Sequence, residues 1–203
     1  MEKRLTNKES LSIINEMISQ ARNNFQKDSA LPSIIAGYCV AGVAILNFIL
    51  LFIMPHPEYS FHVWWLMVPM WVVIRITDRK QEQKTLVKTH IDNIVGKMWQ
   101  AYGYSIIISL LSIFGLTFAL DSWLLPALIT PTLLMLTGLV QYITGTAFRF
   151  RPYIYGGIIF WVGALLAVAV YFINANGFHF IILALCMILG FVIPGYKANK
   201  KGE

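Results

Sequence analysis

The chain has 203 residues, of which 57% are hydrophobic and only 13% are charged, and its formal net charge is +6. Soluble domains carry about 25% charged residues, so this composition excludes an ordinary soluble fold and indicates an integral membrane protein. The two cysteines, Cys39 and Cys186, lie inside apolar segments with no metal-ligand spacing, which argues against a disulfide framework.

The first 30 residues are polar and mixed in charge, and they precede the first apolar run. Thr6 followed by Glu9 fits a capping box. Apolar side chains recur on one helical face at Leu11, Ile14, Met17, Ile18, Ala21 and Phe25. We therefore expect a cytoplasmic amphipathic helix over residues 8–26, which either lies on the membrane and caps the bundle or binds a partner protein. The apolar run from Leu31 is too long for a cleavable signal.

Six later segments are apolar enough to be spans, given that a membrane helix needs about 20 apolar residues. The predicted spans are 31–54, 61–76, 100–120, 123–145, 153–173 and 178–195, of which the second and the sixth are short. An amphipathic pattern also predicts a cytoplasmic helix over about 81–98, and residues 197–203 form a tail. The sequence thus predicts an all-α, integral membrane six-helix bundle over residues 31–196, with amphipathic cytoplasmic helices before span 1 and between spans 2 and 3.

The basic residues show how the chain is oriented. All 16 Lys and Arg residues lie in four polar stretches: 1–30, 75–97, 146–152 and the C-terminal tail. The other three connections, at 55–60, 121–122 and 174–177, contain none. Cytoplasmic loops carry an excess of Lys and Arg, so this asymmetry predicts that both termini and the two basic loops are cytoplasmic. Since topology explains the basic charge, no nucleic-acid partner is expected.

The fourth predicted span is the most polar one. A polar stripe within it consists of Thr130, Thr137, Gln141 and Thr144, which fall within about 60° of one another on a helix. Asn47 in the first span is the other candidate for a polar contact within the membrane. The stripe predicts either a path for a small solute or hydrogen bonds that hold helices together. No ionisable residue lies in the middle of a span, which favours packing.

Two further groups of residues could bind a ligand. The first consists of residues at the non-cytoplasmic ends of the spans: His56, Glu58, His62, Asp121 and His179. These side chains suit a metal ion or a pH sensor, although their spacing matches no metal motif and histidine is common at the membrane interface. The second is the FRFRP turn, in which Arg149 and Arg151 either bind an anionic lipid headgroup or phosphate, or only anchor the turn.

Enzyme signatures such as HExxH, GxSxG, Walker A and GxGxxG are absent from the sequence. We therefore expect neither catalytic residues nor a cofactor. The leading hypothesis is a non-enzymatic accessory, sensor or regulatory membrane module that contacts the lipid bilayer and engages a protein partner through its cytoplasmic helices. The alternative is a small-solute transporter or channel with a path along the fourth span.

Several short motifs in the C-terminal third carry a family resemblance. They are Thr144-Gly145, the Phe148–Pro152 turn, Gly156-Gly157, Phe160-Trp161, Leu189-Gly190 and Ile193-Pro194-Gly195-Tyr196. Together with the N-terminal SLSIINEMI helix, they resemble a family of uncharacterised bacterial multi-span inner-membrane proteins. The resemblance covers most of the chain and implies a multi-pass protein of the bacterial cytoplasmic membrane. It implies no activity, substrate or catalytic residue.

Overall fold

The computed structural model describes residues 7–82, 90–122, 124–173 and 177–201, and every element in this part of the chain is helical. The elements, in chain order, are α1 (Asn7–Ile53), the 3₁₀ helix η1 (Pro57–Leu66), α2 (Met67–Glu82), α3 (His90–Leu120), the 3₁₀ turn η2 (Leu125–Leu128), α4 (Ile129–Ala147), α5 (Arg151–Phe172), α6 (Phe178–Met187), the π-helical segment η3 (Ile188–Val192) and α7 (Ile193–Lys201).

Five of the described helical segments are long and apolar enough to cross a membrane. They are Ala30–Ile53, His90–Leu120, Leu125–Ala147, Arg151–Phe172 and Phe178–Lys200. The apolar helix Tyr59–Ile74, which coincides with the second predicted span, is shorter than a usual spanning helix. The predicted all-α class is confirmed for the described residues, and so is a set of membrane-length helices, whereas only five of the six predicted spans reach full length.

Two predicted boundaries differ from the structure. The expected amphipathic helix at 8–26 is not separate from the first span, because α1 runs unbroken from Asn7 to Ile53 with Pro32 inside it. An interior proline removes one helical hydrogen bond and its ring crowds the carbonyl four residues earlier, yet the remaining bonds carry the helix past Pro32. The expected helix at about 81–98 is likewise continuous with its span from His90 onward, while residues 83–89 lie outside the described part.

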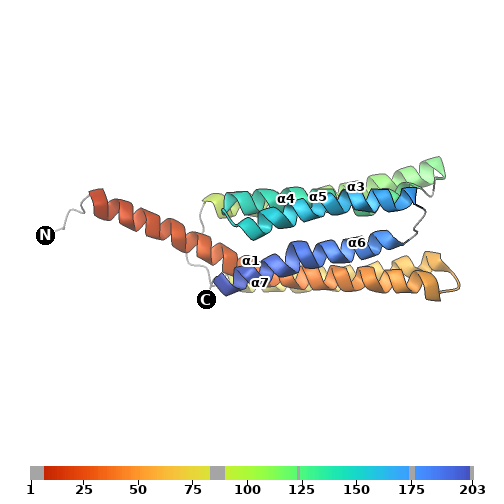
Figure 1. The fold of residues 1–203 in the computed structure, drawn as a ribbon, viewed down its shortest axis with the longest axis horizontal. Helices are drawn as coiled ribbons and strands as arrows, with labels where there is room; N and C mark the ends of the chain where they lie inside the picture. The colour runs from red at the N-terminus through yellow and green to blue at the C-terminus, as the bar shows by residue number, and fades with distance from the viewer. Residues whose placement is uncertain (1–6, 83–89, 123, 174–176, 202–203) are drawn as a thin grey trace.

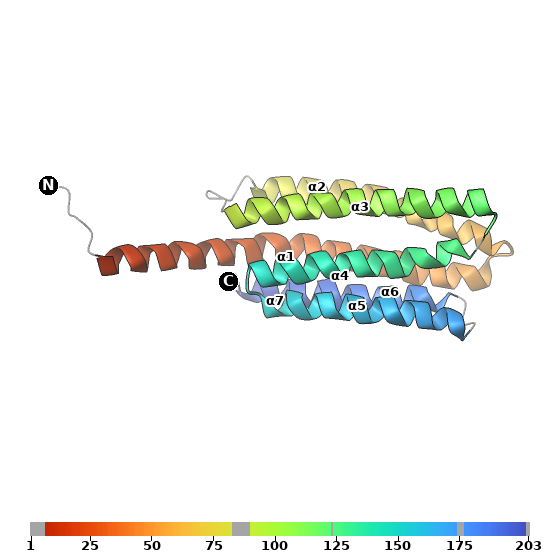
Figure 2. The ribbon, with the colours of Figure 1, turned by 90° about the horizontal axis from the view of Figure 1, so that it is seen from above.

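The helices form two layers. Figure 1 shows α3, α4 and α5 in one layer and α1, α6 and α7 in the other, and Figure 2 shows the same bundle from above. The main core lies between the layers, where buried aromatic and small side chains meet. Its members include Ala44, Leu134, Phe160, Phe180, Met187 and Phe191, with Trp64 and Trp99 packed against it.

The described basic residues outside α2 and α3 gather at one end of the bundle. The α4–α5 turn, the last turn of α7 and the projecting N-terminal part of α1 lie there (Figure 1). Arg149, Arg151, Lys197 and Lys200 are all exposed at this end, which we call the basic end. The opposite end, formed by the connections after α1, α3 and α5, has neither Lys nor Arg in those connections. We call it the far end.

Candidate functional site

The four residues of the polar stripe in the fourth predicted span are all buried on one face of α4. Gln141 is fully inaccessible, and the exposed fractions of Thr130, Thr137 and Thr144 are 5%, 5% and 1%. Polar groups buried away from water are costly unless they form hydrogen bonds. The partners of these side chains therefore decide whether the stripe lines a path or holds helices together.

Two of the threonines bind α3. The hydroxyl of Thr144 donates to the carbonyl of Val140 at 2.8 Å and accepts from the Trp99 indole Nε1 at 3.2 Å. In the same way, Thr137 donates to the carbonyl of Leu133 at 2.7 Å and lies 2.7 Å from the Tyr102 hydroxyl. Because a hydroxyl has one hydrogen, Tyr102 is the donor of that second bond. These bonds join α3 to α4.

Gln141 binds a backbone carbonyl that lacks its usual α-helical donor. Its Nε2 donates to the carbonyl oxygen of Gly190 in η3 at 3.1 Å. In an ordinary α-helix the N–H of residue 194 would bond to that oxygen, but position 194 is a proline and has no N–H. The side chain of Gln141 therefore supplies a donor where the proline removes one, next to the π-helical segment.

The contact between α4, α5 and η3 depends on small residues. A Cβ atom on Gly156 would lie 2.6 Å from the Gly190 oxygen and 3.4 Å from the Gln141 amide nitrogen. A Cβ on Gly190 would lie 2.6 Å from the ring of Phe160. These glycines let the backbones approach closely enough for the Gln141 bond, as small residues do between membrane helices. The Oε1 atom of Gln141 is buried and has no hydrogen-bond partner.

Asn47 belongs to a different part of the bundle. In the amide orientation that satisfies both of its ends, it donates to the carbonyl and hydroxyl of Ser60 at 3.2 and 2.9 Å and accepts from Trp64 Nε1 at 2.8 Å. These bonds join α1 to η1 near the far end, because Asn47 is less than two turns from the end of α1 at Ile53. Gln141 lies equally close to the basic end of α4, so the two amides lie in opposite halves of the bundle.

The turn that carries the two candidate arginines closes α4. Phe150 N–H donates to the Gly145 carbonyl at 2.7 Å, and Arg149 N–H donates to the Thr146 carbonyl at 3.1 Å. This is the Schellman pattern, whose left-handed position usually holds glycine. Here Arg149 occupies it with φ of 50°. Arg151 is the first residue of α5, and both arginine side chains are exposed.

Two buried aromatic side chains hold this turn in place. Phe150 and Tyr153 pack edge to face with ring centroids 5.1 Å apart, and both are almost fully buried together with Ala30 and Ala198. The Tyr153 hydroxyl also lies 3.1 Å from the Ser33 hydroxyl of α1. The turn is therefore anchored to α1 and α7, and its arginines project from a fixed backbone.

The candidate metal or pH-sensing residues are spread over the far end. His56 and His62 both contact Tyr59, with His62 Nδ1 3.0 Å from the Tyr59 carbonyl. His179 instead stacks on Tyr171 of α5 and lies 3.3 Å from its hydroxyl. Asp121 holds the left-handed position of the turn after α3, with φ of 46° and the Ser122 N–H bonded to the Thr117 carbonyl.

Among the described residues, no three His, Cys, Asp or Glu side chains are grouped closely enough to hold a metal ion. The side chain of Glu58 lies outside the described part of the chain. The metal and pH-sensor hypotheses for this end therefore stay predictions.

The residues that bind the stripe were not predicted from the sequence. Trp99, Tyr102 and Gly190 are its partners, and a groove beside Gly156 was not foreseen. One signal was present: Pro194 follows Gly190 at the spacing that leaves a carbonyl without its donor. No family model matches the chain, and neither a curated protein nor a solved structure matches it. The resemblance to bacterial inner-membrane proteins therefore remains an expectation.

Proposed function

We propose that this chain is a non-enzymatic module of the bacterial cytoplasmic membrane, with both termini in the cytoplasm, that binds a partner protein through the N-terminal part of α1. The observation that carries the proposal is the projecting helix itself. Residues 7–29 extend beyond the basic end as a single helix (Figure 1), which we call the arm.

The direction of the arm favours a protein partner over the membrane surface. The arm provides roughly 35 Å of helix and is continuous with the first span, so it leads away from the bilayer instead of lying in its plane. Figures 1 and 2 show no other described element beside its outer part. The exposed fraction of Leu11, the first residue of the apolar stripe, is 60%. An amphipathic helix whose first apolar residue is exposed suits a partner that offers an apolar groove.

The orientation follows from the charges, and it requires an even number of spans. We propose that η1 and α2 together form the second span, which brings the total to six. The 3₁₀ stretch from Pro57 to Leu66 rises about 2 Å per residue and so extends roughly 20 Å. From Met67 to Arg75, α2 adds roughly 13 Å. The sum matches the hydrocarbon core of about 30 Å, although the segment has fewer residues than a usual spanning helix.

The arm proposal is tested by position-specific crosslinking in cells. A photo-crosslinking amino acid replaces Leu11 in one variant and Glu16, which lies away from the apolar stripe, in the matched control. We expect one protein adduct, of constant mass, at position 11 and much less of it at position 16. Once the partner is identified, Leu11→Asp should weaken the purified complex about tenfold, as loss of an apolar anchor does, whereas Ser12→Asp should leave it unchanged.

Other results would contradict the proposal. Equal adducts at both positions would show non-specific proximity. A self-adduct alone would make the arm a contact between two copies of this chain. Adducts with lipid alone would show that the arm lies on the membrane surface.

The structure gives less support to a solute path along α4. The hydroxyls of Thr137 and Thr144 and the amide of Gln141 bond to α3 and η3, as they do in a closed bundle. A flux assay in proteoliposomes tests this alternative. Uptake of a solute that is lost in folded Gln141→Leu protein would favour transport over the module proposed here.

A further inference from the structure

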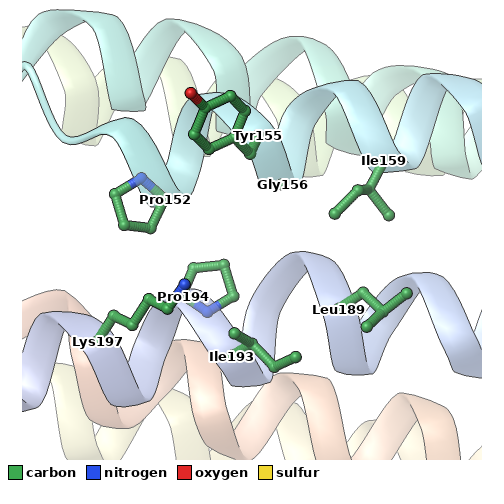
Figure 3. Close-up of a pocket in the computed structure, with 8 residues that line it drawn as sticks. All are labelled: Pro152, Tyr155, Gly156, Ile159, Leu189, Ile193, Pro194 and Lys197. Atoms are coloured by element: carbon green, nitrogen blue, oxygen red, sulfur yellow. The ribbon is translucent and has the colours of Figure 1, made fainter.

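A groove of about 150 Å³ opens at the basic end of the bundle, and none of the hydrogen-bonded stripe residues lines it. One wall is the first two turns of α5, and the other is the junction of η3 with α7. In Figure 3, Pro152 and Ile159 of α5 point across the slot toward the wall that carries Leu189, Ile193, Pro194 and Lys197. The Tyr155 hydroxyl points away from that wall.

The groove follows from the same backbone features that surround Gln141. The walls meet where Gly156 lies against the Gly190 carbonyl, and this glycine is also part of the lining. Helices that cross at a close contact separate on either side of it. Toward the basic end, the slot is bordered by the short rings of Pro152 and Pro194, which face each other in Figure 3.

The chemistry of the groove changes along its length. Its inner part is lined by aliphatic side chains, whereas Lys197 provides a positive charge. No carboxylate is among its eight lining residues. Arg151 precedes the lining residue Pro152, and Phe150 at the N-cap of α5 makes no side-chain capping bond, so the positive end of the helix dipole adds to the charge. An anion with an apolar tail complements this arrangement.

The dimensions and setting favour a lipid over a soluble ion. From Lys197 to Leu189 the wall covers roughly 12 Å, about the distance from a headgroup to the upper acyl chain. The rim residues Tyr155, Leu189 and Ile193 are exposed, and they belong to segments of membrane-spanning length. A dry apolar cavity of about 150 Å³ is known to hold a molecule the size of benzene, so this groove suits one segment of an acyl chain.

We propose that this groove binds one anionic phospholipid. The upper part of an acyl chain lies against Ile159, Leu189 and Ile193, and the headgroup phosphate binds Lys197, with Arg151 adding positive charge at the mouth. The lipid would fill the space between α5 and α7 that the protein leaves open. This inference does not depend on the arm or on its partner.

The test measures lipid retention by the full-length protein. Protein in nanodiscs of phosphatidylcholine and phosphatidylglycerol is extracted into mild detergent, and native mass spectrometry counts the bound phosphatidylglycerol. Lys197→Gln should reduce retention about fivefold, the effect of one basic residue near an anionic headgroup. Lys200→Gln, which removes a nearby exposed charge outside the groove, should change it by less than about twofold.

A second pair of variants tests the acyl-chain slot without changing charge. Ile193→Trp should fill the groove and reduce retention, whereas Ile158→Trp, at an exposed position of α5 outside the lining, should not. Both pairs are compared only in protein that elutes as a single species with unchanged helical content.

Three results would overturn the proposal. The first is equal retention by Lys197→Gln and Lys200→Gln, which would indicate diffuse surface charge. The second is equal retention by the two tryptophan variants. The third is stabilisation of the protein by inorganic phosphate alone to the same melting temperature that phosphatidylglycerol gives, which would indicate a site for a free anion.

Discussion

The glycines of α3 and those of the α4–α7 region have opposite surroundings. A Cβ atom placed on Gly96, Gly103 or Gly115 of α3 would meet nothing within 4 Å. On Gly138, Gly145, Gly156, Gly157, Gly163, Gly190 and Gly195 it would meet another helix within 3 Å. Burial differs in the same direction. In α3, 6% of an 18-residue apolar stretch is buried, whereas 56% of such a stretch is buried in the segment that runs from α6 to α7.

This difference teaches that the same residue type has two roles in one bundle. In the α4–α7 region, glycines bring backbones together and make room for the Gln141 bond. In α3, the connection to the bundle comes instead from large side chains, Trp99 and Tyr102, that reach across to α4. The first region is held by close backbone contact and the second by a few polar links, so substitutions should affect the two regions differently.

The largest difference in stability is expected between two glycine-to-alanine substitutions, one in each region. Gly156→Ala should lower the free energy of unfolding by roughly 3 kcal/mol, the upper end for an overpacked core, because its Cβ would meet a backbone oxygen that cannot move freely. Gly115→Ala should raise it by roughly 0.5–1 kcal/mol, since alanine is the better helix former in open space. Unfolding in mixed micelles with increasing SDS measures both. The same sign for the two variants would refute the contrast.

Loss of the Gln141 hydrogen bond should have the next largest effect on stability. Gln141→Leu should cost about 2 kcal/mol, because the buried Gly190 carbonyl then loses the donor that replaces the missing N–H of Pro194. Pro194→Ala supplies a new N–H at the position that the proline lacks, so Gln141→Leu should cost clearly less in that background. The double-mutant cycle in the same SDS titration gives the coupling energy. Additive effects would show that the proline is not the reason for the bond.

Two turns contain a non-glycine residue in the left-handed conformation, and we expect glycine to stabilise them to different extents. Arg149→Gly should raise the free energy of unfolding by about 1 kcal/mol, because a side chain in that conformation is strained. Asp121→Gly, at the matching position after α3, should give a smaller gain since aspartate tolerates this conformation. Thermal unfolding in detergent distinguishes them. A larger gain from Asp121→Gly would contradict the argument.

The smallest expected effect concerns the polar link between α3 and α4. Tyr102→Phe removes only the hydroxyl that binds Thr137 and should cost about 0.6 kcal/mol, the average for a hydrogen bond between membrane helices. Tyr104→Phe is the control, because the Tyr104 side chain is exposed and bonds only to Gln100 of the same helix turn. Equal losses of stability in the two variants would show that the hydrogen bond between Tyr102 and Thr137 does not stabilise the contact of α3 with α4.

Local features of the sequence were sufficient to predict the class of fold. The hydrophobic runs predicted membrane-length helices, and the spacing of Thr137, Gln141 and Thr144 predicted that they share a buried face. Such inferences succeed because hydropathy and helical period depend only on residues close together in the chain. They did not predict that the polar N-terminal helix and the first apolar segment form one continuous helix, α1.

The sequence by itself determined that this chain is helical, that several of its helices are long and apolar enough to cross a membrane, and that α4 carries a polar stripe. Only the tertiary structure decided what the stripe does. The donor that Pro194 removes is replaced by Gln141, which lies 49 positions from Gly190 in sequence. The groove at Lys197 likewise needs two helices to meet at Gly156 and Gly190. Partners so distant in sequence leave no periodic signal, because side-chain period records which face is buried and not which helix covers it.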